Sequence, residues 1–454
     1  MNAPDLPLGP RLPAAIQLFW WLRDPIELLA RCQSRFGDAF SIRLPAPATP
    51  VVVLCSPEGA KEIFAMSGDL AHAGEANAVL HPFLGRHSLL LLDGPEHLRQ
   101  RKMMLPAFHG ERMQAYGRAM MDLTHHAVDA WPLGRAFPVH RSMQSIALQV
   151  ILRAVFGVES GPGQARLAGA LARGLEVAGN PILLLPAIQR DLGPLSPWGR
   201  YLRVAAKATA LLRDEIRRGK AEGTAGRNDV LAMLLEARDE TDRPLSEDEI
   251  HDEMMTLLVA GHETTATALA WALRWILPDR ALLGRLRDEI ASADGQPARI
   301  AKLELLDGTV KEALRLQPVL PLVGRVLQAP ARVAGIDLPK GAAVAASIYN
   351  IHRRPSLYPE PERFWPDRFA KFKPAPWEWI PFGGGLRRCI GASFATYEMK
   401  MVLASLLPRV DARLAVRKVG PVRRAVTLTP SRGLPIVVTA KRPREPANLL
   451  RQNA

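Results

Sequence analysis

The chain has 454 residues, of which 48% are hydrophobic and 23% are charged, so it can bury a large core and does not belong to the disordered class. Its 59 basic and 45 acidic side chains give a net charge of +14. It has three cysteines, Cys32, Cys55 and Cys389, which exclude a disulfide framework and fit a reducing compartment.

No secretory signal is expected at the N-terminus, because no basic run precedes an apolar core. The most apolar piece, residues 14–22, is about half of the roughly 20 residues that a membrane-spanning helix needs. We therefore expect a cytoplasmic protein without a transmembrane segment.

Short strands are predicted next, because residues 40–44 alternate in polarity and residues 51–54 are rich in valine. These two segments are expected to pair, and residues 57–64 to form a helix. Helical patterns then dominate residues 97–300.

The clearest helical pattern begins at Ser246, which forms a predicted capping box with Glu249. Apolar residues follow at spacings of three and four until Leu277, and Pro278 ends the pattern. A helix of this extent would be roughly 46 Å long at 1.5 Å per residue. Such a helix is expected to cross the middle of a large domain.

Short strand-like pieces follow Pro318, at residues 325–327, 331–333 and 342–348. Residues 425–429 and 434–439 flank a Pro-Ser-Arg-Gly turn, which predicts a hairpin. The pattern as a whole predicts one mainly α (α+β) domain over residues 1–454, with small sheets near its two ends in sequence.

Most of the positive charge lies in residues 409–454, which hold eleven basic and two acidic residues. A basic surface can attract nucleic acid, anionic lipid or an acidic protein. A solvated, arginine-rich terminus is the simpler interpretation, so no nucleic acid partner is predicted.

The most informative string is Phe-Gly-Gly-Gly-Leu-Arg-Arg-Cys-Ile-Gly at residues 382–391. Successive glycines allow the main chain to approach a flat partner closely. Cys389 follows two arginines at the predicted start of a helix, where the dipole and the cations favour the thiolate that binds metals. Cys32 and Cys55 lack this environment and are interpreted as inert buried thiols.

A zinc site fits poorly, because no second cysteine lies within two to four residues of Cys389. A phosphate-binding loop also fits poorly, because the glycines are not followed by Gly-Lys-Ser or Gly-Lys-Thr. Heme brings its own equatorial ligands and needs one axial thiolate from the protein, which matches one activated cysteine.

The string resembles the cysteine loop of the cytochrome P450 family, Phe-x-x-Gly-x-Arg-x-Cys-x-Gly, at Phe382, Gly385, Arg387, Cys389 and Gly391. The resemblance covers essentially the whole chain. It implies the helix-rich fold of that family, with small β-sheets and a long central helix. It also implies heme b (iron protoporphyrin IX) bound through the axial thiolate of Cys389, with Phe382 and Gly391 beside the cofactor.

A second motif of the family, Glu-x-x-Arg, is matched by Glu312 and Arg315. By the resemblance, an arginine further along the chain completes a buried ion network with them. Arg368 is preferred over its rival Arg363, because the family pattern places a phenylalanine ahead of the proline in residues 364–369.

The long helix carries Ala-Gly-His-Glu-Thr-Thr at residues 260–265, which resembles the oxygen-activation sequence of the family. Small residues at Ala260 and Gly261 let a flat ligand lie against the helix. Glu263 and Thr264 are the implied catalytic pair, able to pass protons through water. The alternative for Thr264 is a hydroxyl that bonds back to its own helix.

Heme propionates need cationic partners. The resemblance assigns this role to His97 and Arg101, which lie four apart on a predicted helix, and to Arg325 and Arg387.

The activity implied by the resemblance is that of a heme-thiolate monooxygenase, and the alternative is a non-catalytic heme sensor or carrier. Because no flavin or iron–sulfur segment remains once the motifs are assigned, electrons are expected from a ferredoxin or flavodoxin with its reductase. A monomer is expected.

The implied substrate pocket is largely aliphatic, which favours a lipophilic substrate such as a terpenoid, steroid, fatty acid or polyketide. An equally simple interpretation is that these residues are ordinary core. The predicted pocket residues are Val79, Leu80, Phe83, Thr256, Val259, Leu320, Val323 and Ser431.

Overall fold

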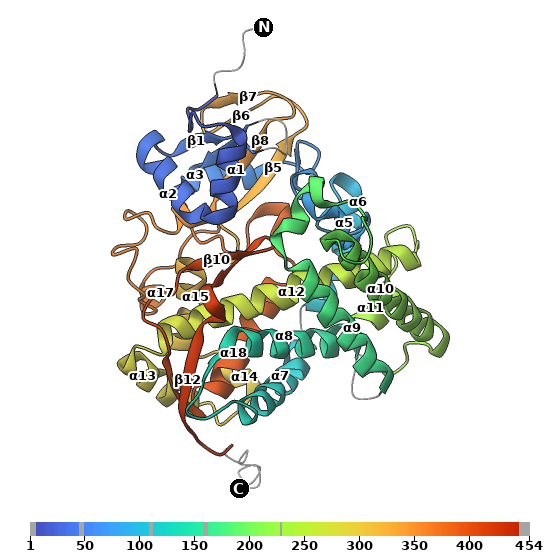
Figure 1. The fold of residues 1–454 in the computed structure, drawn as a ribbon, viewed down its shortest axis with the longest axis vertical. Helices are drawn as coiled ribbons and strands as arrows, with labels where there is room; N and C mark the ends of the chain where they lie inside the picture. Colours follow the sequence, from blue (N-terminus) through green and yellow to red (C-terminus); the bar gives the residue numbers. More distant parts are fainter. Residues whose placement is uncertain (1–5, 45–49, 109–111, 158–161, 228, 445–454) are drawn as a thin grey trace.

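The computed structural model describes residues 6–44, 50–108, 112–157, 162–227 and 229–444. The end of the predicted basic segment, including Arg451, lies outside the described residues. The fold is rich in helices with small sheets, which confirms the predicted class (Figure 1).

The α-helices are α1 (Ala14–Arg23), α2 (Pro25–Phe36), α3 (Pro57–Ala65), α4 (Ala73–Ala76), α5 (His81–Leu84), α6 (Gly94–Met104), α7 (Arg112–Asp129), α8 (Val139–Phe156), α9 (Pro162–Ala178), α10 (Pro197–Glu222), α11 (Val230–Glu236), α12 (Glu247–Ile276), α13 (Arg280–Ala291), α14 (Pro297–Ile300), α15 (Glu304–Leu316), α16 (Ile348–Ile351), α17 (Arg368–Lys371) and α18 (Ala392–Leu406). Short 3-10 helices are η1 (Ala78–Leu80), η2 (Leu105–Phe108), η3 (Pro181–Leu184), η4 (Pro186–Ile188), η5 (Gly385–Arg387) and η6 (Ser431–Gly433).

The strands are β1 (Ala39–Ile42), β2 (Val51–Leu54), β3 (Ala71–His72), β4 (Ala136–Pro138), β5 (Leu322–Leu327), β6 (Ala331–Val333), β7 (Ile336–Leu338), β8 (Ala343–Ser347), β9 (Val410–Leu414), β10 (Pro421–Arg424), β11 (Thr427–Pro430) and β12 (Pro435–Lys441). The largest sheet has the order β1-β2-β8-β5-β3, and a second has the order β4-β12-β9. Two further pairs are β10-β11 and β6-β7.

The long helix α12 is present as predicted and crosses the middle of the molecule in Figure 1. Its N-terminus has the predicted capping box, in which the Ser246 hydroxyl accepts from the Glu249 N–H and the Glu249 carboxylate accepts from the Ser246 N–H. Most of its later residues are buried, so core packing adds to the stability that the cap provides.

The N-terminal strands also form as predicted. β1 pairs antiparallel with β2, and β2 pairs in parallel with β8, so that Val51 lies opposite Ala343. The valine run of β2 is buried on both faces, as is usual for a strand inside a mixed sheet.

The predicted hairpin at the C-terminal end is wrong. β11 pairs with β10, whereas β12 pairs with β4 and β9. The connection does not fold back on itself, because Arg432 and Leu434 adopt positive φ angles of 55° and 52° that send the chain into another sheet. Ser431, predicted at the tip of a hairpin, therefore begins η6 between two separate sheets.

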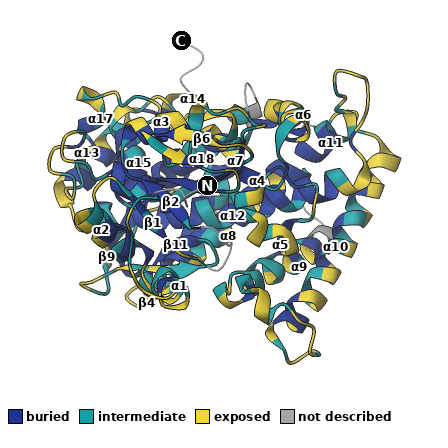
Figure 2. Ribbon diagram, turned by 90° about the horizontal axis from the view of Figure 1, so that it is seen from above, coloured by how far each residue is buried: buried dark blue, intermediate teal, exposed yellow. Residues whose placement is uncertain are grey.

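Burial is greatest at the centre of the molecule. In Figure 2 the buried residues gather around α12, α15 and α18, while exposed residues lie mainly on peripheral helices such as α10 and α13. Within the described part of the chain, no helix is both long enough and apolar enough to span a bilayer.

Candidate active site

The cysteine loop precedes α18 and is held by its own backbone. The Cys389 N–H donates to the Phe382 carbonyl at 2.9 Å, and both Gly383 and Gly385 have positive φ angles, of 64° and 63°. A Cβ on Gly385 would lie 2.0 Å from the carbonyl oxygen of Phe64 on α3. Gly385 therefore allows the loop to approach α3 closely. The sequence pattern did not reveal this contact with α3.

The Cys389 thiol lies in the fold among basic residues. Burial raises the pKa of the Cys389 thiol, while the Gly391 N–H, Arg101 and Arg388 oppose that rise. The effect of desolvation on the pKa of Cys389 is therefore larger than the effect of the nearby cations, on which the sequence-based prediction relied. Coordination to a metal would stabilise the thiolate further.

The three cysteines differ as the sequence predicts. Cys389 keeps exposed surface although desolvation affects its thiol, so the thiol is accessible to a ligand. Cys32 and Cys55 are buried, and burial raises the pKa of Cys32 to about 11 and that of Cys55 further still. Neither buried thiol has an environment that favours metal binding.

The four predicted propionate partners come together from α6, β5 and η5. Burial, together with the charges of Arg387, Arg101 and Arg325, lowers the pKa of His97 to about 3. Burial also lowers the pKa of Arg325 and of Arg387 to about 10 each.

This cationic cluster has little compensating negative charge within the described chain. Asp93 lies 3.7 Å from Arg387, and its carboxylate also accepts from the N–H groups of Gly74 and Glu75. Asp93 is the carboxylate near Arg387 and Arg325, and the cluster keeps an excess of positive charge that an anionic ligand would neutralise. The cluster and the accessible thiol of Cys389 therefore fit a heme, whose propionates are anionic and whose iron takes an axial thiolate.

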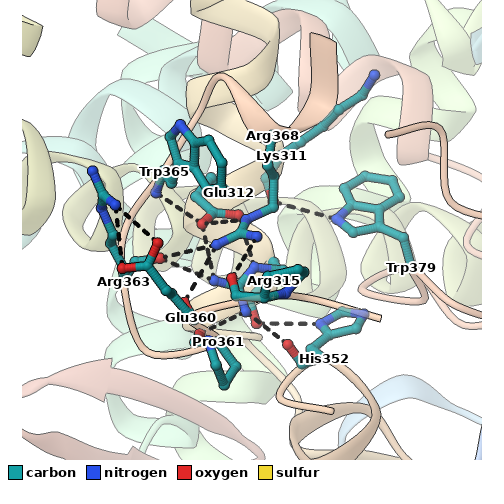
Figure 3. Close-up of polar contacts among 11 residues, drawn as sticks. Lys311, Glu312, Arg315, His352, Glu360, Pro361, Arg363, Trp365, Arg368 and Trp379 are labelled. Carbon is teal, nitrogen blue, oxygen red and sulfur yellow. Dashed lines mark hydrogen bonds and ion pairs between the residues drawn. The ribbon is translucent and has the colours of Figure 1, made fainter. Parts of the chain in front are cut away.

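Glu312, Arg315 and Arg368 form a buried ion network (Figure 3). Arg315 donates from Nε and Nη2 to the two Glu312 oxygens at 2.7 and 2.9 Å, and Arg368 donates from Nε to Glu312 Oε1 at 3.1 Å. The rival residue Arg363 instead pairs with Glu360 at the surface, and only its backbone carbonyl accepts from Arg315. The structure thus places Arg368 in the position that the sequence analysis preferred.

His352 also belongs to this network, and the sequence analysis missed it. Its Nε2 accepts from the Ile380 N–H at 2.8 Å, and its Nδ1 lies 3.2 Å from the Arg315 carbonyl. Full burial and the neighbouring Arg315 hold its pKa well below the usual range, so the ring is neutral. His352 therefore connects α15 to the segment that leads into the cysteine loop, a link that no motif in the sequence signals.

The residues of the motif on α12 make different kinds of contact. The Thr264 hydroxyl donates to the Ala260 carbonyl, the arrangement recognised as the alternative to a catalytic position. A Cβ on Gly261 would lie 2.8 Å from the Ile151 side chain on α8, so the missing side chain serves the close packing of α12 on α8. Ala260 and Gly261 are both partly exposed.

The predicted pocket residues pack against more than one hydrophobic cluster. Leu80, Phe83 and Val259 share a hydrophobic cluster with Leu183, Trp198 and Tyr201, residues that the sequence analysis did not single out individually. Leu320 and Val323 pack against a different cluster, and Val79 is exposed. The buried Thr256 hydroxyl is within 2.7 Å of the Ser88 hydroxyl and donates to the Asp252 carbonyl.

Comparisons with known proteins agree with this geometry. The family model described as Cytochrome P450 matches residues 6–432. Two relatives from Mycobacterium tuberculosis are "Putative cytochrome P450 135B1", 39% identical over 96% of this chain and 92% of the relative, and "Putative cytochrome P450 135A1", 35% identical over 94% of each. Among solved structures, retinoic acid-bound cyanobacterial CYP120A1 has a TM-score of 0.84 and 26% identity, covering 96% of this chain and 100% of that one.

Proposed function

The chain belongs to the cytochrome P450 family, and from that premise we propose that it inserts one oxygen atom of O2 into a lipophilic substrate, with Cys389 as the axial ligand of its heme. The family consists in general of heme monooxygenases with a cysteine thiolate on the iron. The observation that carries the assignment to this chain is the accessible Cys389 thiol beside Arg101 at the start of α18.

The bound heme would supply O2 binding and redox chemistry. Cys389 would hold its iron, while His97, Arg101, Arg325 and Arg387 would bind its propionates. Phe382 and Gly391 flank the thiolate in the loop, and Ala260 lies on α12. The buried network of Glu312, Arg315 and Arg368 would keep the loop in place.

Proton supply is assigned to Glu263 and Thr264. Burial raises the pKa of the Glu263 carboxyl, so it can hold a proton nearer to neutral pH than an exposed glutamate. Rotation of the Thr264 hydroxyl away from the Ala260 carbonyl would free it to pass that proton onward.

The proposed substrate is lipophilic, of the terpenoid, steroid, fatty acid or polyketide classes. The aromatic and aliphatic cluster of Leu80, Phe83, Val259 and Trp198 supports this class. The similar CYP120A1 structure contains retinoic acid, which is itself a lipophilic molecule.

Turnover with a surrogate ferredoxin and its reductase tests the monooxygenase assignment. The wild-type protein is expected to convert members of a lipophilic compound library to products heavier by one oxygen atom, detected by mass spectrometry. Thr264→Ala is expected to lower product formation by up to about 100-fold while electrons are lost to hydrogen peroxide. A protein that binds heme but oxidises no compound, with no difference between wild type and Thr264→Ala, would instead be a sensor or carrier.

Electrons are proposed to come from a separate ferredoxin or flavodoxin with its reductase. Carriers of this kind are typically acidic, and the exposed Arg388 beside Cys389 offers a basic contact near the proposed heme ligand. We also propose a single-domain, cytoplasmic monomer. The one-domain organisation is supported by a buried hydrophobic cluster whose members extend from Leu89 to Val438 in sequence. The cytoplasmic location is supported by the three free cysteines, which fit a reducing compartment.

Electron transfer from an acidic ferredoxin is expected to slow by about tenfold or more as salt is raised, because the attraction between the partners is screened. Arg388→Gln should lower the low-salt rate, whereas Lys220→Gln on α10, which changes the net charge equally, should not. Stopped-flow reduction measures both rates. A rate independent of salt would rule out electrostatic docking.

A further inference from the structure

Glu263 belongs to a buried polar cluster, and the residues that contact its carboxylate lie outside the family motif. The Gln144 amide on α8 donates to Glu263 Oε2 at 2.7 Å, and His140 Nε2 on the same helix lies 3.6 Å from Glu263 Oε1. Arg424, on β10, places its Nε 3.4 Å from that same oxygen. Three elements distant in sequence thus meet at one carboxylate.

The fold fixes Arg424 at this position. β10 pairs with β11, and β11 is fastened to α12 because the Trp271 indole donates to the Leu428 carbonyl at 2.8 Å. After β10, the Ala425 N–H donates to the Gly179 carbonyl at 3.0 Å. A Cβ on Gly179 would lie 3.1 Å from Arg424 Nε, so the guanidinium passes closely beside this glycine.

Arg424 also joins the carboxylate to the surface. Its side chain is 31% exposed, whereas that of Glu263 is 16% exposed. Three buried atoms of the cluster, Glu263 Oε1, Arg424 Nε and His262 Nδ1, have no hydrogen-bond partner in the described protein. Polar atoms gathered in this way are the kind that internal water bridges.

We propose that Arg424 is a positioning residue for Glu263, which orients the carboxylate, limits the effect of burial on its charge and lines the path along which water brings protons to it. This inference rests on the proposed function, in which Glu263 supplies protons. It goes beyond the motif because Arg424 lies about 160 positions away from it on another element.

Charge at the cluster favours this role. Among the described residues, His140 and Arg424 are the titratable and charged groups that face Glu263 from α8 and β10, and His262 precedes Glu263 on α12 and is near Arg424. Burial lowers the pKa of His140 to about 3 and of His262 to about 4, so both rings are neutral at pH 7. Arg424 is then the cation that opposes the rise in the pKa of Glu263 caused by burial.

An infrared pH titration of the purified full chain tests the inference directly. The protonated carboxyl band of Glu263 is identified by its loss in Glu263→Gln. In Arg424→Gln, the midpoint of that band is expected to move upward by about one pH unit or more, because a cation at ion-pair distance is removed. Arg424→Lys, which keeps the charge, should stay close to the wild type.

The matched control is Arg423→Gln, which removes the same charge from the next position of β10. The Arg423 guanidinium lies over the Trp21 ring and donates to the Trp21 carbonyl, so the Glu263 midpoint should not move. Gln144→Leu, which removes a hydrogen bond that favours the charged form, should raise the midpoint independently of Arg424. An unchanged Glu263 midpoint in Arg424→Gln would overturn the inference, whatever the result for Gln144→Leu.

Turnover provides the second measurement. With a surrogate ferredoxin and reductase, the fraction of electrons released as hydrogen peroxide should rise in Arg424→Gln, and its pH profile should shift upward with the infrared midpoint. A shifted midpoint with an unchanged peroxide fraction at every pH would refute the proton route. Lack of any turnover in the wild type would refute the proposed function, while the infrared result would still decide whether Arg424 governs Glu263.

Discussion

Cys389→Ala is expected to lose the thiolate-type band in the spectrum of the reduced, carbon monoxide-bound protein, and with it all oxygen insertion. The reason is that Cys389 is the cysteine with exposed surface and nearby cations, Arg101 and Arg388. Replacing a residue that hydrogen-bonds to a metal ligand typically lowers metal affinity or activity by roughly 10–100-fold, and loss of the ligand itself should lower them further. Absorption spectroscopy and turnover of the same sample measure the two effects.

Cys32→Ala and Cys55→Ala are the matched controls. Both thiols are buried, and burial raises the pKa of each well above its usual range. The variants should lose some stability from the smaller side chain but keep the thiolate-type band. A wild-type spectrum without that band, or a band that survives in Cys389→Ala, would contradict the assignment of the axial ligand.

Arg315→Ala is expected to lower the free energy of unfolding by about 3–5 kcal/mol, because it leaves the Glu312 carboxylate buried without its main partner. Both side chains are 0% exposed, so water cannot replace the lost contacts. Arg315 Nη1 also donates to the carbonyls of His352 and Pro361, which would become unpaired. Urea unfolding of the heme-free protein measures the change.

Arg363→Ala provides the comparison. Its side chain is 59% exposed and pairs with an equally exposed Glu360, and such pairs contribute about 0–1 kcal/mol. Its carbonyl, which accepts from Arg315, remains in the variant. Equal destabilisation by Arg315→Ala and Arg363→Ala would show that the buried network is not what holds this region together.

The elements that could be predicted are those whose cause is local. The capping box at Ser246 and Glu249, the apolar periodicity of α12 and the valine run of β2 can each be read over a few residues. The hairpin prediction was wrong because strand pairing is not a local property. Two strand patterns that are adjacent in sequence do not reveal that each strand pairs with a different one. Pairing of β12 with β4 depends on residues about 300 positions apart.

The same distinction applies to the candidate site. Residues in short motifs, such as Cys389 and Glu312, stand out because their neighbours in sequence carry the chemistry. His352 and Arg424 act through contacts with elements far from them in sequence, and no local pattern surrounds either residue. The pattern around Gly261 also could not reveal that this glycine packs against Ile151 on a neighbouring helix.

The parallel pairing of β2 with β8 bears on how the protein is made. Val51 and Ala343 are about 290 positions apart, so β2 leaves the ribosome long before its neighbour is synthesised. At about 5–20 residues per second, the valine-rich strand waits roughly 15–60 s with one edge unpaired. During this interval it is open to aggregation, so the yield of folded protein should increase when chaperones are abundant or growth temperature is low.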